Sequence, residues 1–362
     1  TISQYYANPS SLHNLGGQAE KLLTKAREVI AQAMEVSPGE IVFTSGGTES
    51  NNLAIKGIAF QYRSRGKHLI TTQIEHSAVY EVFQSLERDF GFKVTYLPVN
   101  RQGVVEVEEV SRALRDDTIL VSVMHVNNEL GSVQPIEQIG QILKNRPKTF
   151  FHVDQVQGFG KVPLHIKRAG IDLLSVSGHK IHAPKGTGLL YVREGITLYP
   201  LFHGGGQEKG RRSGTKNVPG IVALAKAVRL MKEREEENRE HLWQLRRQLI
   251  AGLEQMEGVA INTPLDENLA APHILNLSCP GIKPEVLVHA LEEKGIYVST
   301  TSACTSKELK PSRTLEAIGL EEERLHSAIR ISTSIYTTAD DIRRLLETLR
   351  QILPQLKAVM RK

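Results

Sequence analysis

A lysine follows an apolar run in the motif Ser-Gly-His-Lys at residues 177–180. Small and polar residues surround Lys180, whereas most lysines lie on the surface. An amine held at the end of a buried strand can form a Schiff base with a carbonyl compound. The motif alone leaves two interpretations open, an ordinary surface lysine after a turn and a nucleophilic amine.

Asp154 ends a second apolar run, at residues 150–154. A carboxylate in this position either caps a turn or pairs with a protonated pyridine nitrogen. A pyridinium ring withdraws electrons and can stabilise a carbanion on a bound substrate. Gln157 follows three residues later and is within reach of the phenolic oxygen of such a ring. The second interpretation predicts a pyridine-ring cofactor beside Asp154.

A glycine-containing stretch, Ser-Gly-Gly-Thr-Glu-Ser at residues 45–50, lies between a predicted strand and a predicted helix. Glycines let the backbone approach an anion, and the amides of a helix N-terminus bind phosphate. The stretch differs from the dinucleotide fingerprint, which needs three glycines at fixed spacing. A glycine turn with a threonine cap is also a common structural feature. His76 opens a later helix, where it either caps the helix or stacks on a flat aromatic cofactor.

The elements that position these residues alternate between strands and helices. Strands are predicted at residues 41–44, 68–72, 93–99, 118–126, 150–154, 172–176 and 187–192, and helices at 48–63, 77–90, 107–115 and 136–146. This alternation predicts an α/β fold with a mostly parallel sheet that is covered on both faces. Ligands of such sheets bind beyond the carboxyl ends of the strands.

The pattern changes in the last third of the chain. A Gly-rich stretch at 203–214 precedes a long helical region at 221–256, whose charge-rich middle predicts a solvated helix and a hinge. The strands predicted beyond it are 259–262, 274–278, 296–300 and 329–333, and the helices are 285–294 and 339–353. We therefore expect a large domain at residues 1–235 and a smaller α+β domain at residues 236–362.

Composition excludes several classes of protein. The 362 residues are 40% hydrophobic, with no apolar run of membrane-spanning length and no signal-peptide pattern. Two cysteines cannot form a disulfide framework, so a reducing cytoplasm is expected. The net charge is +5, but the basic residues are scattered along mixed-charge helices without aromatic residues between them, so no direct nucleic-acid binding is expected. No metal site is expected either.

The chain resembles the NifS/IscS-type cysteine desulfurases, which have the class V aminotransferase-like fold, over essentially its whole length. Eight short motifs in register carry the resemblance, at residues 8–13, 45–52, 75–76, 124–129, 152–157, 177–180, 204–208 and 212–217. The resemblance implies the pyridoxal-phosphate-dependent transferase fold of the aspartate aminotransferase type. Its large domain would hold a mostly parallel, seven-stranded sheet.

The resemblance also implies how pyridoxal 5′-phosphate is held. Lys180 would form the Schiff base, Asp154 would hold the ring nitrogen, Gln157 the phenolic oxygen, and His76 would stack on the ring and act in proton transfer. The phosphate would be bound by Gly47, Thr48, Ser177 and His179, and Asn128 would contact both cofactor and substrate. Thr215 would reach the phosphate of the other subunit, which implies a homodimer.

The same resemblance implies the substrate and the product. Arg330 would bind the carboxylate of L-cysteine together with Asn128, because an arginine fork can bind both carboxylate oxygens. Cys304, in a polar stretch at 300–306, stands where the family has its persulfide-forming cysteine. The persulfide would pass to a sulfur acceptor for iron–sulfur cluster, thio-tRNA or cofactor biosynthesis. Cys279, in contrast, adjoins an apolar strand and is expected in the core.

The sequence departs from the family pattern in three places. The family usually opens with a short strand and an Asn-Ala-Ala-Thr-Thr-like segment, and this sequence starts at Thr1, after that position, as expected of a trimmed chain. Ala183 and Gly47 stand where glycine and alanine, respectively, are common. Competing functions are another class V activity, such as an aminotransferase or a selenocysteine lyase, and a cofactor-binding regulator or sulfur-relay scaffold without turnover.

Overall fold

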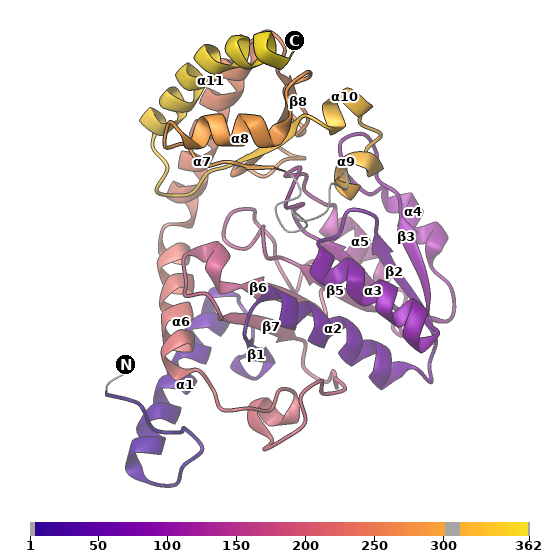
Figure 1. Cartoon of the computed structure of the whole chain (residues 1–362). Coiled ribbons are helices and arrows are strands. Elements are labelled where there is room, and N and C mark those ends of the chain that lie inside the picture. Colours follow the sequence, from indigo (N-terminus) through magenta and orange to yellow (C-terminus); the bar gives the residue numbers. More distant parts are fainter. Residues whose placement is uncertain (1–3, 301–311, 361–362) are drawn as a thin grey trace. The chain divides into compact units, whose positions relative to one another are not determined.

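Seven strands form the larger sheet of the computed structural model, which describes residues 4–300 and 312–360 (Figure 1). Their order is β1-β7-β6-β5-β4-β2-β3. The strands are β1 (Ile41–Thr44), β2 (His68–Thr72), β3 (Lys93–Leu97), β4 (Thr118–Met124), β5 (Phe150–Asp154), β6 (Leu173–Ser177) and β7 (Gly188–Val192). Strands β2 to β6 pair in parallel, and only β7 runs antiparallel to its neighbours β6 and β1. The predicted α/β class with a mostly parallel sheet is confirmed.

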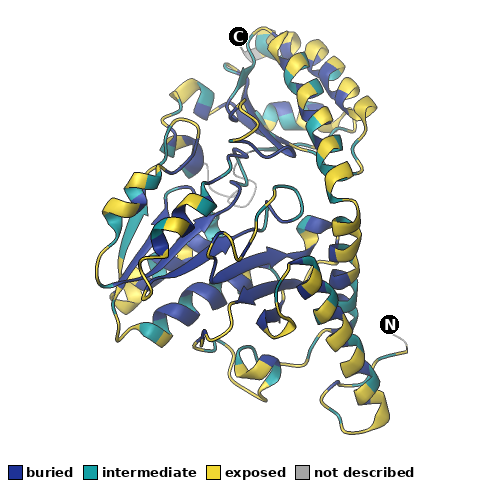
Figure 2. Cartoon of the chain, turned by 180° about the vertical axis from the view of Figure 1, so that it is seen from behind, coloured by how far each residue is buried: buried dark blue, intermediate teal, exposed yellow. Residues whose placement is uncertain are grey.

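Helices flank this sheet. They are α1 (Asn14–Ala33), α2 (Gly47–Tyr62), α3 (Ser77–Phe90), α4 (Val107–Ala113), α5 (Ile136–Leu143) and α6 (Val218–Glu233), with short 3-10 helices η1 (Pro38–Glu40), η2 (Gly178–Ile181) and η3 (Gln207–Gly210). Helix α2 packs along the sheet against β1, β4, β5, β6 and β7, and α1 packs against α6 (Figure 1). The strands β4 to β7 are buried at every position (Figure 2), as expected where helices cover both faces of a parallel sheet.

The chain divides into two compact units. Unit 1 comprises residues 1–97, 107–125 and 135–235, and unit 2 comprises residues 98–106, 126–134 and 236–362. Two short segments that follow strands of the larger sheet therefore cluster with the C-terminal part of the chain.

Unit 2 contains a four-stranded antiparallel sheet in the order β10-β11-β9-β8. Its elements are α7 (Glu235–Glu254), β8 (Ala260–Ile261), β9 (Ile274–Ser278), α8 (Pro284–Glu292), β10 (Ser299–Thr300), α9 (Arg313–Ala317), α10 (Glu322–Leu325), β11 (Ala328–Ser332) and α11 (Ala339–Met360). The apolar sides of α7, α8 and α11 form one hydrophobic core with β9 and β11.

Several helical elements differ from the predicted pattern, and two of them are long. Helix α1 is absent from the elements predicted above, although its buried positions Ala19, Leu23, Ala26 and Ile30 recur at helical spacing. The region predicted as one long helix is two, because the backbone leaves the helical conformation at Arg234, between α6 and α7. None of the described helices is long and apolar enough to cross a membrane.

Candidate active site

The strand register places three predicted segments at one edge of the larger sheet. Thr44, the last residue of β1, and Ser177, the last residue of β6, both pair with Gly188 of β7. Asp154 ends β5, and it pairs with Ser175 of β6. The glycine turn after β1, the motif after β6 and the carboxylate of β5 are therefore neighbours, as expected at the carboxyl edge of such a sheet.

The glycine turn closely approaches the ends of β5 and β6. A Cβ atom on Gly47 would lie 2.8 Å from Val156 Cγ2 and 3.4 Å from Ser177 Cβ. Gly47 begins α2, so the backbone amides of this helix N-terminus open beside Ser177. Ser50 fixes the turn, because its hydroxyl lies 2.8 Å from Thr44 Oγ1 and donates to Leu189 O at 3.0 Å. The arrangement suits a bound phosphate.

Asp154 is buried, with 4% of its surface exposed. Its Oδ2 accepts a hydrogen bond from Asn51 Nδ2 at 2.7 Å, and its Oδ1 accepts one from the Val156 amide at 2.9 Å. Burial raises the pKa of Asp154, while these two donors and the charge of His76 oppose that rise. Within the described residues, no lysine or arginine forms an ion pair with Asp154.

Asn51 was not among the predicted residues, yet it orients Asp154. It lies in α2 and is 1% exposed. If its amide were flipped, the amide oxygen would face the carboxylate, so Asp154 fixes the orientation of Asn51 as well. The signal in the sequence was a polar residue one helical turn after Gly47, on the side of α2 that is otherwise apolar.

His76 caps helix α3. Its Nδ1 accepts a hydrogen bond from the Ala78 amide at 3.0 Å, so the capping interpretation is confirmed and the ring orientation is fixed. Thr48 and His76 line one hollow of about 350 Å³, which brings two predicted cofactor residues together. Stacking of His76 on a cofactor ring stays a prediction.

Ser177, His179 and Lys180 follow one another across the end of β6 into η2. The Ser177 hydroxyl and His179 Nδ1 lie 2.8 Å apart. Burial, followed by the charges of Lys180, Lys185 and Lys161, lowers the pKa of His179. Three lysines thus place positive charge near His179, which favours an anionic group there. Gln157 lies half-buried in the turn after β5.

Two ion pairs anchor the Gly-rich loop that carries Thr215. Glu208 is buried, although its φ of 50° is unusual for a residue other than glycine. Its carboxylate accepts hydrogen bonds from Arg27 Nη2 at 2.7 Å and from the Phe43 amide at 3.0 Å. Arg212 pairs with Glu49, next to the glycine turn, at 2.7 Å. Thr215 is exposed and forms no hydrogen bond with the described residues.

Asn128 and Arg330 belong to unit 2 and lie together there. Arg330, in β11, donates a hydrogen bond from Nη1 to the Asn128 carbonyl at 2.9 Å. The neighbouring Glu129 accepts a hydrogen bond from Ser312. Burial raises the pKa of Glu129, opposed by the Ser312 hydrogen bond and by the charges of Arg330 and Arg313. The structure thus groups the predicted substrate residues in unit 2 and the remaining described site residues in unit 1.

Of the two cysteines, the structure describes Cys279. Cys279 is 0% exposed, and burial raises the pKa of its thiol to about 12. The expected core position of Cys279 is confirmed, and it has almost no thiolate at neutral pH. Cys304 lies outside the described residues.

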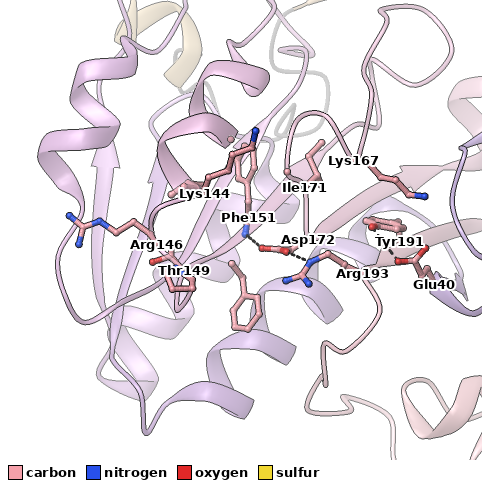
Figure 3. A pocket seen from close by; sticks show the side chains of 15 residues that line it. Glu40, Lys144, Arg146, Thr149, Phe151, Lys167, Ile171, Asp172, Tyr191 and Arg193 are labelled. Atoms are coloured by element: carbon pink, nitrogen blue, oxygen red, sulfur yellow. Dashed lines mark hydrogen bonds and ion pairs between the residues drawn. The ribbon is translucent and has the colours of Figure 1, made fainter.

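A different hollow, of about 470 Å³, lies at the opposite edge of the larger sheet (Figure 3). Asp172, just before β6, accepts hydrogen bonds there from the Phe151 amide at 2.8 Å and from Arg193 Nε at 2.6 Å. Tyr191 donates to Glu40. None of the predicted site residues lines this hollow, and its buried carboxylates already have donors in the chain.

Comparison with known proteins gives a consistent result. Residues 1–345 match the Aminotransferase class-V family. A protein of Dictyoglomus turgidum named "Cysteine desulfurase IscS" is 42% identical, with 99% of this chain and 90% of that protein covered. A protein of Vibrio cholerae with the same name is 46% identical, covering 99% of this chain and 88% of that protein. The solved structure of a "NifS-like protein" superposes with a TM-score of 0.92 at 41% identity, over 98% of this chain and 93% of that chain.

Proposed function

Because the chain belongs to the Aminotransferase class-V family, and within it to the IscS/NifS-type cysteine desulfurases, we propose that it removes sulfur from L-cysteine. Pyridoxal 5′-phosphate is its cofactor. The products in this proposal are L-alanine and a persulfide on Cys304. Asp154 carries the proposal, because it is a buried carboxylate with two fixed neutral donors and, among the described residues, no ion pair to a lysine or arginine.

The residues of unit 1 fit this cofactor. A buried carboxylate is most stable beside a cation, and a protonated ring nitrogen would provide one for Asp154. The glycine turn lies beside Ser177 at the N-terminus of α2, where backbone amides can bind an anion. Ser177, His179 and the first amides of α2 would hold the phosphate. Gln157 would donate to the phenolic oxygen of the ring.

The bound cofactor supplies a carbonyl group for the substrate amine and an electron-withdrawing ring that stabilises negative charge at the substrate Cα. Asp154 would hold the protonated ring nitrogen. Lys180 would hold the cofactor through its amine and would act as the base for the proton on the substrate Cα. His76, with its ring held by the cap of α3, would donate or accept a proton nearby.

Arg330 and Asn128 would orient the substrate. The guanidinium of Arg330 can bind both oxygens of the L-cysteine carboxylate. One of its N–H groups donates to the Asn128 carbonyl, which supports the guanidinium and holds the two predicted substrate residues together.

Sulfur transfer needs a thiolate as the nucleophile. The Cys304 thiolate forms an S–S bond with the substrate sulfur while the substrate Cβ–S bond breaks, and the electron pair of that bond remains with the substrate carbon. Of the two cysteines in the chain, Cys279 is unsuited because its thiol is buried and has a raised pKa. The persulfide would then pass to an acceptor protein for iron–sulfur cluster, thio-tRNA or cofactor biosynthesis.

The working unit in this proposal is a cytoplasmic homodimer. Thr215 is exposed, and the loop around it is anchored by Glu208 and Arg212, which supports presentation of Thr215 to the phosphate of a second subunit. A cytoplasmic location agrees with a buried, unpaired Cys279.

The experiment that tests this function is turnover of L-cysteine without any keto acid, followed by mass spectrometry of the protein. We expect stoichiometric alanine and a mass gain of one sulfur on the Cys304 peptide. Cys304→Ser should retain the bound cofactor but form neither product, and Cys279→Ser is the matched control that should retain turnover. Sulfur on the Cys279 peptide, or turnover that requires a keto acid, would contradict the proposal.

A further inference from the structure

The turn after β5 carries a lysine that the functions above do not use. Lys161 follows Asp154 and Gln157 on the same turn, in which the Lys161 amide donates to the Gly158 carbonyl at 3.0 Å. Two glycines fix the path of this turn. A Cβ atom on Gly158 would lie 2.3 Å from His125 Nδ1, and one on Gly160, which has a φ of +69°, would lie 1.7 Å from Met231 Sδ. The position of Lys161 is therefore set by close packing.

The side chain of Lys161 returns to the lysine proposed to bind the cofactor. Its Nζ donates a hydrogen bond to the Lys180 carbonyl at 2.9 Å. No carboxylate among the described residues forms an ion pair with Lys161. Lys161 is half-buried, and an ammonium group in such a place that donates to a carbonyl but has no ion-pair partner among the described residues is an uncommon arrangement.

Within the described part of the chain, the groups whose charges interact with Lys161 are Lys180, His179 and His182, which are all basic. Lys180 and Lys161 both contribute to lowering the pKa of His179, and Lys161 contributes to lowering that of His182. Burial, and then the charge of Lys180, lowers the pKa of Lys161 to about 8. Lys161 thus still carries a proton for most of the time at neutral pH. Lys185 adds a further positive charge near His179, but it is exposed.

We propose that Lys161 is a positioning residue for Lys180, whose ammonium holds the Lys180 backbone and, by placing a second positive charge nearby, favours the neutral, nucleophilic form of the Lys180 amine. The electrostatic part follows from reciprocity. If the charge of Lys180 disfavours protonation of Lys161, the charge of Lys161 disfavours protonation of Lys180 by the same free energy. This inference depends on the proposed role of Lys180.

Lys161 acts through Lys180 rather than on the substrate. Its Nζ is engaged by the Lys180 carbonyl, on the main chain and not at the reacting amine. Its effect should therefore appear in the protonation equilibrium of the link between Lys180 and the cofactor, even without substrate.

The test is a pH titration of the visible absorption band of the holoenzyme, in the absence of substrate. Borohydride reduction and peptide mapping of the unaltered protein come first. If the cofactor is found on a lysine other than Lys180, the proposed function has failed. If it is found on Lys180, the titration tests Lys161 alone.

Three variants separate charge from hydrogen bonding. Lys161→Met removes both, Lys161→Gln keeps a donor without the charge, and Lys161→Arg keeps both. We expect the titration midpoint to rise by about one pH unit in the Met and Gln variants, because a neighbouring like charge has been removed, and to stay near its original value in the Arg variant.

Lys185→Met is the matched control, since it removes an exposed positive charge that solvent screens. Its midpoint should move by less than half as much. Should the Met variant not fold, the Gln and Arg variants still give the comparison. An unchanged midpoint in Lys161→Gln, or an equal shift in Lys185→Met, would overturn the inference.

Discussion

The two edges of the larger sheet each hold a buried aspartate, and the two differ in what neutralises them. Asp154, at the end of β5, is 4% exposed, and Asp172, just before β6, is 8% exposed. Burial raises the pKa of both. Asp172 has a cation within the chain, because it pairs with Arg193 at 2.6 Å (Figure 3). Asp154 has only neutral hydrogen-bond donors, Asn51 and the Val156 amide, and the charge of His76 also acts on it.

This difference distinguishes a structural carboxylate from a functional one. The hydrogen bonds of Asp172 connect the ends of β5, β6 and β7, and Arg193 neutralises the charge of its carboxylate. Asp154 is also held by two hydrogen bonds, but burial raises its pKa, and a cationic ligand would stabilise its ionised form. For this reason, a carboxylate with a shifted pKa at the carboxyl edge of a sheet is a candidate for a catalytic or binding residue.

The largest expected effect concerns the lysine at the carboxyl edge. Lys180→Ala should lose the covalent link to the cofactor and lower kcat by about four orders of magnitude, because both the link and the general base disappear. The measurement is alanine formation together with the absorption spectrum. Lys185→Ala is the exposed control and should behave as the unaltered protein; comparable loss in both variants would contradict the assignment.

Exchanging each aspartate for asparagine should give opposite results at the two edges. Asp154→Asn should lower kcat by about a hundredfold or more, because an amide cannot keep the ring nitrogen protonated, and should leave the apoprotein folded. Asp172→Asn should instead reduce the free energy of unfolding by about 1–3 kcal/mol, since an amide cannot accept from both Phe151 and Arg193. Turnover per folded molecule should then be retained.

Chemical denaturation and steady-state kinetics on the same two variants check this contrast. A large loss of stability in Asp154→Asn with normal turnover, or a large loss of turnover in a stable Asp172→Asn, would reverse the roles of the two edges.

An effect of intermediate size is expected on cofactor affinity when the glycine turn is changed. Gly47→Ala should weaken cofactor binding by about 1 kcal/mol, because the added methyl group meets Val156 Cγ2 at 2.8 Å. Val156→Ala removes that contact, so the double variant should bind the cofactor as the unaltered protein does. Equilibrium dialysis measures the affinities, and a double variant no better than Gly47→Ala would show that the collision lies elsewhere.

The smallest expected effect is a dependence of stability on pH. Burial raises the pKa of Asp154 above 3.8, so in the apoprotein its contribution to stability is present below that value and is lost as the pH rises through the folded-state pKa. A bound pyridinium would offset the loss. The difference in Tm between holoprotein and apoprotein should therefore grow, by about 2 °C, as the pH rises through the folded-state pKa of Asp154.

The control for this pH effect is Asp154→Asn, which has no carboxyl group at this position. In this variant the difference in Tm should not grow as the pH rises. Scanning calorimetry of both proteins, with and without cofactor, makes the comparison. Equal growth in the variant would mean that another group accounts for it.

The carboxyl edge could be predicted from sequence because each of its residues follows an apolar strand. Asp154 and Lys180 are the polar residues at the ends of buried runs, and strand–helix alternation brings such ends to one edge. Helix α1 has an equally clear period of apolar residues, but it precedes the first strand and was not predicted.

The supporting residues could not be predicted in the same way, because their roles arise from contacts between distant segments. Asn51 meets Asp154 across 103 positions, and Arg27 meets Glu208 across 181. Lys161 shows no local signal that it reaches the Lys180 carbonyl. Which short segments cluster with the C-terminal unit, such as residues 126–134, also depends on tertiary packing rather than on local composition.

The most direct test of the central claim, that the carboxyl edge of the larger sheet is the catalytic site, is borohydride reduction of the holoenzyme followed by peptide mapping. Reduction should abolish the visible band and leave the cofactor mass on the peptide that contains Lys180, with none on peptides containing Lys144 or Lys167, which line the hollow at the opposite edge. Cofactor attached to either of those lysines, or no covalent attachment in a protein that turns over L-cysteine, would contradict the account.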